Sequence, residues 1–251
     1  GTAYRTYQSS SLLMKVSGGT IKEISGVGAV TQHLKDIEHD INVHDVTYEN
    51  SQARERTQIL MDYANKIGGM VLGTGSLSEM ALGWATYNGD HMSMYAVNGG
   101  VPKTLVASLV RWIANKYMEG TVKDVLLDIL DTPFSPELLP ANKEGKIAQK
   151  TEHFVGPYEL HDFFINRMLR HNDEPNRIYF IAQQAFKGSY SSEEILKWLK
   201  VFYRRFFSQQ FKRSCMPDSP MVGAINLSPR ASWRMPSDAM ATVWLDELDK
   251  L

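Results

Sequence analysis

Cysteine is almost missing from this sequence, since Cys215 is the single one among 251 residues. One cysteine excludes a disulfide framework and a multi-cysteine zinc site within the chain, so we expect a reduced, cytoplasmic setting. Long apolar runs are missing too, and nothing approaches the roughly 20 residues that a membrane-spanning helix needs. The stretch from Gly1 to Ser11 has no basic region followed by an apolar one, so we expect no signal peptide.

An excess of either charge is also missing, because 27 Lys and Arg oppose 28 Asp and Glu for a net charge of -1. A chain that binds nucleic acid or a membrane surface over a wide area is normally more basic. Hydrophobic residues make up 43% and charged residues 22%, which is typical of a folded chain rather than a disordered one. A chain of this length can bury a full core without covalent staples.

The first half alternates between helical and strand-like segments. A short extended piece at 21–24 is followed by a helix at 52–67, whose expected apolar face holds Ile59, Leu60, Tyr63, Ala64 and Ile67. Gly68-Gly69 ends that helix. The apolar residues 70–72 resemble a buried parallel strand, and 76–85 forms the next helix. This order predicts an α/β fold with a parallel sheet.

The second half is mainly helical. We expect helices at 104–117, with Leu105, Leu109, Val110, Ile113 and Tyr117 apolar, and at 158–169, 191–208 and 237–248. No linker separates independent domains, so 1–251 is interpreted as one domain. Within it we expect an α/β part at 1–130, an irregular mobile segment at 131–156 and a helical part at 157–251.

The loop Gly73-Thr74-Gly75 is the most informative stretch, because it follows a strand and opens a helix. Ligands of open α/β sheets bind beyond the carboxyl ends of the strands, and a helix N-terminus offers free N–H groups to phosphate. Glycines let the backbone approach the ligand, and Thr74 can donate its hydroxyl. The alternative is a plain strand–helix turn in which Glu79 closes a capping box on Ser76.

Aromatic and polar residues follow this loop. The run 84–91 contains two aromatic rings and Asp90 beside an Asn-Gly turn, so it could stack on a base and bind a ribose. A hydrophobic anchor and a turn aspartate are the commoner explanation. Lys103 opens the next helix and could reach a phosphate, although such a lysine is usually solvated. Arg54 and Arg56 lie on different helix faces, and an inward Arg56 could hold a phosphate or a carboxylate.

Two charged stretches leave alternatives open. The His and Asp residues between 33 and 45 suggest a metal cluster by composition, but their spacing favours loop and cap residues. The segment 200–234 interleaves basic residues and aromatic rings, with Asp218 its single acid, and could bind single-stranded nucleic acid or the phosphates of a dinucleotide. A helix with an aromatic core face and a solvated basic face explains 200–207 equally well.

Taken together and in order, these stretches resemble NAD⁺ synthetase, most closely the synthetase domain of the long, glutamine-dependent type. The resemblance covers nearly the whole chain and is carried by 44–56, Gly73-Thr74-Gly75, Ser78-Glu79, Gly89-Asp90, Lys103, 156–162, 211–213 and 233–238. It implies a Rossmann-like adenine-nucleotide α-hydrolase, or ATP pyrophosphatase, fold with a parallel sheet and a mainly helical C-terminal part.

The resemblance also implies a reaction. ATP adenylates the nicotinate carboxylate of deamido-NAD⁺ and releases pyrophosphate, and ammonia then attacks to give NAD⁺ and AMP. No covalent enzyme intermediate is needed, so we single out no catalytic nucleophile. The implied ATP-binding residues are Thr74, Lys103 and Ser135, and the implied Mg²⁺ ligand is Glu79. The implied deamido-NAD⁺ residues are Asn50, Arg56, Glu79, Trp84, Ala85, Thr86, Tyr87, Asp90 and Lys212.

Several departures qualify the resemblance. The short, ammonia-dependent enzymes carry Lys, Asp and His where Tyr87, Met94 and Phe211 stand here, which favours the long type. The Ser-Gly-Gly-x-Asp-Ser loop that grips ATP in the family is absent, because Ser17-Gly18-Gly19 continues with Thr20, Ile21 and Lys22. In the family that loop lies upstream of the part matched here, as does the glutaminase domain.

We therefore expect a chain with little or no ligase activity alone, whose full-length protein draws ammonia from glutamine. Homo-oligomers are expected from the resemblance. The alternative is a non-catalytic dinucleotide-binding or assembly fragment. A nucleic-acid binder that uses 200–234 is a third interpretation, which the near-neutral total charge opposes.

Overall fold

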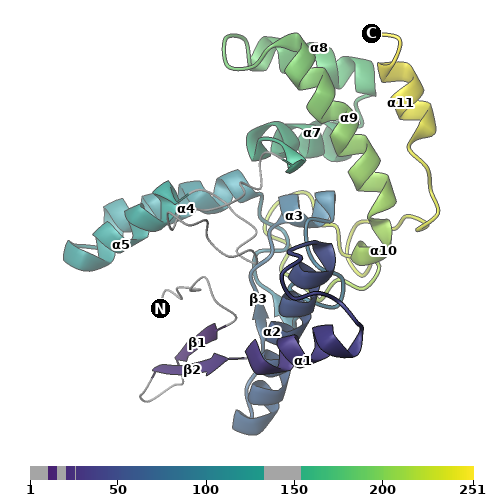
Figure 1. Cartoon of the computed structure of the whole chain (residues 1–251). Coiled ribbons are helices and arrows are strands. Elements are labelled where there is room, and N and C mark those ends of the chain that lie inside the picture. The colour runs from purple at the N-terminus through teal and green to yellow at the C-terminus, as the bar shows by residue number, and fades with distance from the viewer. Residues whose placement is uncertain (1–10, 16–20, 26, 133–153) are drawn as a thin grey trace. The chain divides into compact units, whose positions relative to one another are not determined.

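The computed structural model describes residues 11–15, 21–25, 27–132 and 154–251, and these fall into two compact units. The first unit holds the described residues up to Val71 together with Thr86–Ser93. The second holds Leu72–Ala85 with the described residues of 94–132 and 154–251. Figure 1 labels helices and strands of both units.

The first unit contains an antiparallel hairpin and two packed helices. Strands β1 (Ser11–Lys15) and β2 (Ile21–Ser25) pair with Ser11 opposite Ser25, which confirms the extended piece expected at 21–24. Helix α1 (Val27–Asp36) packs on α2 (Val46–Ile67). Helix α2 begins six residues before the expected start, because the Asp45 carboxylate accepts the backbone N–H groups of Thr47 and Tyr48 at 2.9 and 3.1 Å.

The end of α2 confirms one expectation and corrects another. Gly68 lies in the left-handed region at φ +63° and ends the helix, as predicted. The buried residues of α2, however, are Ser51, Gln52, Ala53 and Ala64, and the predicted apolar residue Ile67 is 48% exposed. The helix turns small and polar side chains inward near its start, which its hydrophobic period alone does not reveal.

The described parallel sheet of the second unit is small. Strand β3 (Leu72–Gly73) pairs in parallel with β4 (Tyr95–Ala96), with Leu72 opposite Tyr95. The parallel pairing was predicted. The expected burial of residues 70–72 holds for Val71 alone, because Met70 and Leu72 are 58% and 53% exposed. Strands with a continuous apolar sequence are typical of sheets that are covered by helices on both faces. The pairing of β3 with β4 is only two residues long and buries few side chains.

Helix α3 (Leu77–Leu82) follows β3 directly. It begins at the cap residue Ser76, as predicted, but ends at Gly83 rather than at residue 85. Gly83 has φ +57°, and a Cβ built there would lie 2.3 Å from the Gln209 Cβ. Both the backbone conformation and the close approach of Gln209 therefore require glycine at this position.

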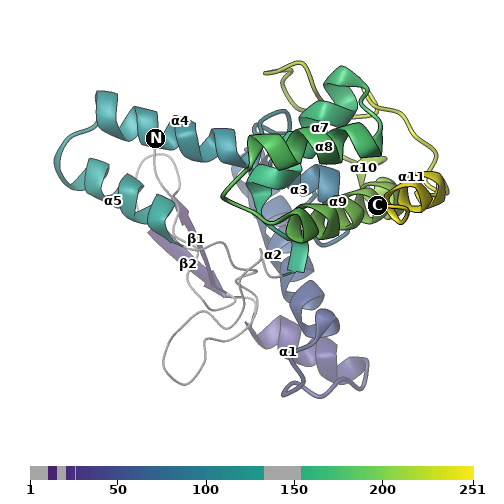
Figure 2. The same ribbon diagram turned by 90° about the horizontal axis from the view of Figure 1, so that it is seen from above.

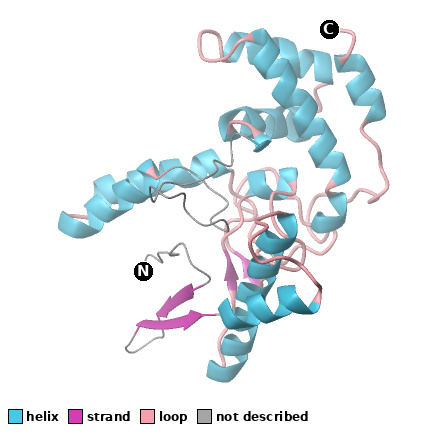
Figure 3. Cartoon of the chain, in the orientation of Figure 1, coloured by secondary structure: helices cyan, strands magenta, loops and turns pink. Residues whose placement is uncertain are grey.

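The core of the second unit is helical (Figures 2 and 3). Helix α9 (Ser192–Ser208) packs against α3, α7 (Tyr158–His171), α8 (Pro175–Ala185), α10 (Gln210–Arg213) and α11 (Thr242–Leu248). Its Phe202, Tyr203 and Phe206 are fully buried. Fully burying such aromatic side chains stabilises the fold by roughly 1.5–3 kcal/mol each.

The helix boundaries in this part follow the expectations closely. Ser191 and Glu194 form the capping box that their spacing predicted at the start of α9. Helix α7 runs to His171, two residues past the expected end. Helix α11 starts only at Thr242 instead of residue 237, because Ser237 and Asp238 form a turn after Pro236.

Helices α4 (Lys103–Tyr117) and α5 (Gly120–Asp131) pack on one another and extend away from the helical core of the second unit (Figures 1 and 2). The predicted apolar face of α4 exists, but among the described residues it is largely uncovered. Ala114 is the one buried residue of α4, whereas Leu105 and Leu109 are each 42% exposed and Tyr117 is 58% exposed.

Candidate functional site

The start of α3 carries a reciprocal set of hydrogen bonds. The Ser76 Oγ accepts the backbone N–H of Glu79 at 3.3 Å, and the Glu79 Oε2 accepts the backbone N–H and the hydroxyl of Ser76 at 2.7 and 2.9 Å. The capping-box interpretation of Glu79 is therefore confirmed. Thr74 lies exposed in the loop before this helix.

Glu79 has a second oxygen, which faces Lys103. The Lys103 Nζ lies 2.8 Å from the Glu79 Oε1, and both side chains are only about a fifth exposed, at 22% and 19%. The structure thus joins two residues that the sequence placed in one site, 24 positions apart. Charge-assisted pairs of this length are stronger than neutral hydrogen bonds, particularly where solvent is partly excluded.

The start of α4 is held by side chains from other helices. Its cap residue Pro102 makes no side-chain capping bond. Instead, the Lys103 backbone N–H donates to the Ser78 Oγ at 2.8 Å, and the Thr104 N–H and hydroxyl donate to the Asp162 Oδ2 at 3.0 and 2.6 Å. The Ser78 hydroxyl in turn donates to the Asp162 Oδ1.

These six residues, Ser76, Ser78, Glu79, Lys103, Thr104 and Asp162, form what we call the Glu79–Asp162 cluster. Burial raises the pKa of the Asp162 carboxyl, and the charge of Glu79 raises it further, whereas the bonds from Ser78 and Thr104 lower it. Sequence reasoning assigned no role to Thr104 or Asp162. The available signal was Pro102, which leaves the first N–H groups of α4 in need of acceptors from elsewhere.

The end of α3 gathers three further predicted residues. The Lys212 Nζ donates to the carbonyls of Gly83 and Ala85 at 2.8 and 2.6 Å. The Arg205 guanidinium carbon lies over the Trp84 ring, 5.2 Å from the centroid of that ring. The Trp84 ring also stacks on the Phe154 ring, with 6.4 Å between the two centroids. Trp84, Ala85 and Lys212 are therefore brought together, with Lys212 bonded to the backbone.

Two arginines complete this arrangement. The Arg205 Nε donates to the Leu82 carbonyl at 2.9 Å, and the Arg213 Nη1 donates to the Ala81 carbonyl at 2.8 Å. Arg213 is fully buried, and burial lowers its pKa to about 9. These cations satisfy the last carbonyls of α3 and complement the negative end of its dipole. The fully buried Arg213 cannot serve as a surface contact for nucleic acid.

The remaining predicted residues lie in the first unit. The Thr86 hydroxyl donates to the Asn50 Oδ1 at 2.7 Å, and the Thr86 N–H donates to the Asp90 Oδ1 at 2.7 Å. The Tyr87 ring stacks on His91 at 5.3 Å. The structure therefore brings Asn50, Thr86, Tyr87 and Asp90 together.

The Arg54 Nε donates to the Tyr87 carbonyl of this loop at 3.2 Å, and Arg56, on the same helix, is half-buried. Ser135 lies outside the described residues.

Other candidate sites carry less chemistry. No three metal-ligating side chains converge within the described residues, and Asp45 of the suggested His/Asp cluster serves as the α2 cap beside His39.

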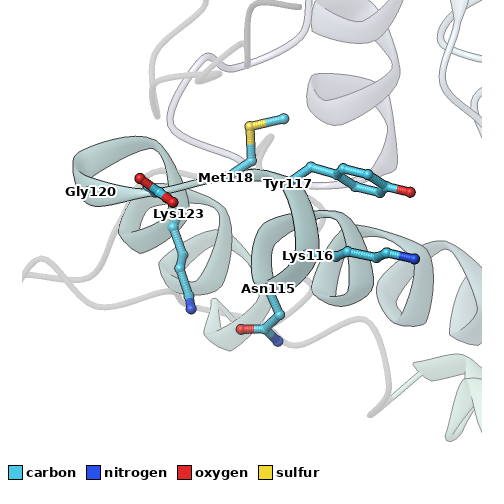
Figure 4. A pocket seen from close by; sticks show the side chains of 7 residues that line it. Asn115, Lys116, Tyr117, Met118, Gly120 and Lys123 are labelled. Atoms are coloured by element: carbon cyan, nitrogen blue, oxygen red, sulfur yellow. The ribbon is translucent and has the colours of Figure 1, made fainter.

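A pocket of about 600 Å³ opens at the α4–α5 turn (Figure 4). Residues 115–120 and Lys123 line it, and none of the predicted site residues does. None of the helices in the described ranges is long and apolar enough to cross a membrane.

The chain is similar to known proteins in sequence and in fold. A family model described as NAD synthase matches residues 7–192. Glutamine-dependent NAD(+) synthetases of Mycobacterium leprae and Mycobacterium tuberculosis are 44% and 42% identical over 99% of this chain. The chain spans 40% of the length of each of these curated relatives.

Among solved structures, a glutamine-dependent NAD(+) synthetase from Cytophaga hutchinsonii matches with a TM-score of 0.71 and 24% identity. The match covers 92% of this chain and 36% of that one. This likeness confirms the expected fold, a Rossmann-like architecture with a parallel sheet and a helical C-terminal part.

Proposed function

This chain belongs to the NAD synthase family, and we propose that it provides the synthetase site of a glutamine-dependent enzyme. In the proposed reaction, ATP adenylates the nicotinate carboxylate of deamido-NAD⁺ and pyrophosphate leaves. Ammonia then attacks the mixed anhydride, giving NAD⁺ and AMP. Both substrates are anionic, so the site must supply cations and N–H donors that offset their repulsion.

The observation that carries the proposal is the Glu79–Lys103 pair beyond the β3 strand end. Lys103 is a partly buried cation at the start of α4, and Thr74 offers an exposed hydroxyl in the preceding glycine loop. We assign Lys103, Thr74 and Ser135 to ATP. Lys103 is suited to offset charge that develops on the leaving pyrophosphate.

Glu79 suits a magnesium ion that accompanies ATP. Mg²⁺ prefers oxygen ligands and is usually held by one or two carboxylates together with phosphate oxygens and water. The Glu79 Oε1 faces the Lys103 ammonium group rather than the backbone, while the Glu79 Oε2 is bonded to Ser76. When bound, the ion would neutralise phosphate charge. The chain's own contribution is to hold Glu79 in place through Ser76.

We assign deamido-NAD⁺ recognition to two sets of residues. In the first unit these are Asn50, Arg56, Thr86, Tyr87 and Asp90, of which Tyr87 offers a ring and Asn50 and Asp90 offer polar groups. In the second unit they are Glu79, Trp84, Ala85 and Lys212, where a cation and an indole ring lie at the end of α3.

The partners of the whole protein are also part of the proposal. The relatives are named glutamine-dependent and are longer than this chain, which supports glutamine as the ammonia source and a glutaminase domain upstream. The exposed apolar residues of α4 and α5 support a homo-oligomer.

Calorimetric titration of this chain with deamido-NAD⁺, and in parallel with ATP, tests the binding assignments. Saturable binding of deamido-NAD⁺ supports the dinucleotide assignment, and a lack of binding by either nucleotide contradicts both. The reaction is tested on the protein encoded by the whole reading frame, by following NAD⁺ formed from deamido-NAD⁺, ATP and ammonia. Binding of deamido-NAD⁺ without any turnover would favour the alternative of a non-catalytic dinucleotide-binding or assembly fragment.

A further inference from the structure

We propose that Asp162 is a positioning residue that fixes the spacing between Glu79 and Lys103. The inference rests on the proposed function, because it concerns the two residues assigned to ATP and its metal ion. Asp162 comes from α7, more than 50 positions from either residue, and its carboxylate bonds to the chain neighbours of both. It acts through their chain neighbours.

The neighbours in question are Ser78 and Thr104. Ser78 precedes Glu79 on α3, and Thr104 follows Lys103 on α4. The Asp162 Oδ1 accepts the Ser78 hydroxyl, while the Oδ2 accepts both the N–H and the hydroxyl of Thr104. One carboxylate thus holds the two helix starts from which the members of the pair project.

Capping gives this arrangement its strength. The first N–H groups of α4 have no partner inside the helix, and Pro102 supplies no side-chain acceptor. Ser78 accepts the Lys103 N–H, and Asp162 accepts the Thr104 N–H. The place where α4 begins is therefore determined by α3 and α7 rather than by the local sequence. A carboxylate also suits the positive end of the α4 dipole.

The chemistry requires a carboxylate and not merely a polar side chain. Three donors converge on the two oxygens of Asp162: the hydroxyls of Ser78 and Thr104 and the Thr104 N–H. An ionised carboxylate accepts on both oxygens, whereas an amide has one accepting oxygen and one donating nitrogen. In Asp162→Asn the amide nitrogen would face donors on one side, so either Ser78 or Thr104 would lose its acceptor.

The matched control is Glu159→Gln. Glu159 lies on the same helix and accepts a hydrogen bond from the Tyr190 hydroxyl, outside the Glu79–Asp162 cluster. Both substitutions replace a hydrogen-bonded carboxylate of α7 with its amide. A general effect of removing one negative charge from α7 would appear in both variants, and a positioning effect would appear in Asp162→Asn alone.

Two readouts test the inference on the whole protein. Amide hydrogen exchange should accelerate about tenfold or more at Lys103 and Thr104 in Asp162→Asn, because a lost charge-assisted bond changes an equilibrium by about that factor. The kinetic constants should split. The value of kcat/KM for ATP should fall about tenfold or more, whereas KM for deamido-NAD⁺ should stay within about twofold, because eight of the nine residues assigned to deamido-NAD⁺ lie outside the cluster. Glu159→Gln should change neither readout.

The outcomes separate this inference from the proposed function. Unchanged exchange and unchanged ATP kinetics in Asp162→Asn would overturn the inference while the function stands. A parallel loss for both substrates with a lower melting temperature would overturn it as well, because the role would then be general stability. If the natural protein forms no NAD⁺, the proposed function fails, and ATP calorimetry with the exchange data decides the inference. Should Asp162→Asn not fold, Ser78→Ala removes the same link and must reproduce the split.

Discussion

Protonation of His161 should limit the acid stability of the second unit. The imidazole is fully buried, with the Phe164 and Phe202 rings 6.0 and 6.2 Å away. Its Nε2 bonds to the Val155 carbonyl, which places the proton of the neutral ring on that nitrogen. Burial lowers the pKa of His161 from 6.5 to about 4, and the charge of Arg205 adds to the effect.

The folded and unfolded chains bind the His161 proton in different pH ranges, and this makes the free energy of unfolding depend on pH. Between pH 6.5 and 4 the unfolded chain binds a proton at this histidine and the folded chain does not, so the free energy of unfolding falls as the pH falls. Above pH 6.5 neither state is protonated, and this contribution is constant. Lowering the pKa from 6.5 to about 4 reduces the free energy of unfolding by about 3 kcal/mol once the pH is below both values.

The assay is urea unfolding followed by tryptophan fluorescence at several pH values from 7.5 to about 4.5, since the chain has 5 tryptophans and all lie in the second unit. His161→Gln keeps an N–H donor for Val155 but does not titrate. Between pH 7 and 4.5 the natural protein should lose about 2–3 kcal/mol more than this variant. Carboxyl groups titrate in both proteins and cancel in the comparison.

His171→Gln is the matched control, because His171 ends the same helix and is exposed. It should leave the pH dependence of the natural protein unchanged. A stability difference between the natural protein and His161→Gln that stays flat from pH 7 to 4.5 would refute the argument, since the buried ring would then take up its proton as easily as in the unfolded chain.

Three further substitutions are informative. Glu79→Gln in the whole protein should abolish magnesium-dependent pyrophosphate release, whereas unchanged release would leave Glu79 with its capping role alone. Lys212→Ala should weaken deamido-NAD⁺ binding in calorimetry and cost about 1–3 kcal/mol in urea unfolding, because two carbonyls lose their donor; unchanged affinity with lowered stability would assign Lys212 to the fold. Arg213→Met should cost about 3–5 kcal/mol in urea unfolding by stranding buried carbonyls, and a loss below about 1 kcal/mol would contradict the capping role.

Local signals in the sequence predicted the helix boundaries well where the cap chemistry was visible. Gly68 ends α2 and Ser191 with Glu194 begins α9, as their spacing indicated. The early start of α2 was missed because the pattern search began at the apolar residues, whereas the Asp45 cap lies before a polar stretch. Burial was harder to predict, because a run such as Met70-Val71-Leu72 is apolar whether or not a covering layer exists.

The site was predictable to the extent that its residues follow a strand or open a helix. Glu79 and Lys103 satisfy that rule, and the structure joins them. Asp162 does not, because it lies within α7 and its partners are 58 and 84 positions away. A hydrogen bond over such a separation leaves no periodic trace in one sequence. The assignments of Arg56, Ser135 and the other nucleotide-binding residues, and the three-part division of the chain, stay predictions.

The short helix α3 has a consequence for the order of folding. Six residues are too few to form a stable helix alone, since the first turn costs more than it returns. The carbonyls at its end, those of Ala81, Leu82 and the cap residue Gly83, are bound by Arg213, Arg205 and Lys212, which lie more than 120 positions later in the chain. Helix α3 can therefore become stable only after α9 and α10 have docked, so the glycine loop and Glu79 should be among the last parts of the second unit to reach their final positions. During synthesis, the proposed nucleotide site would remain unformed until the ribosome has passed Arg213.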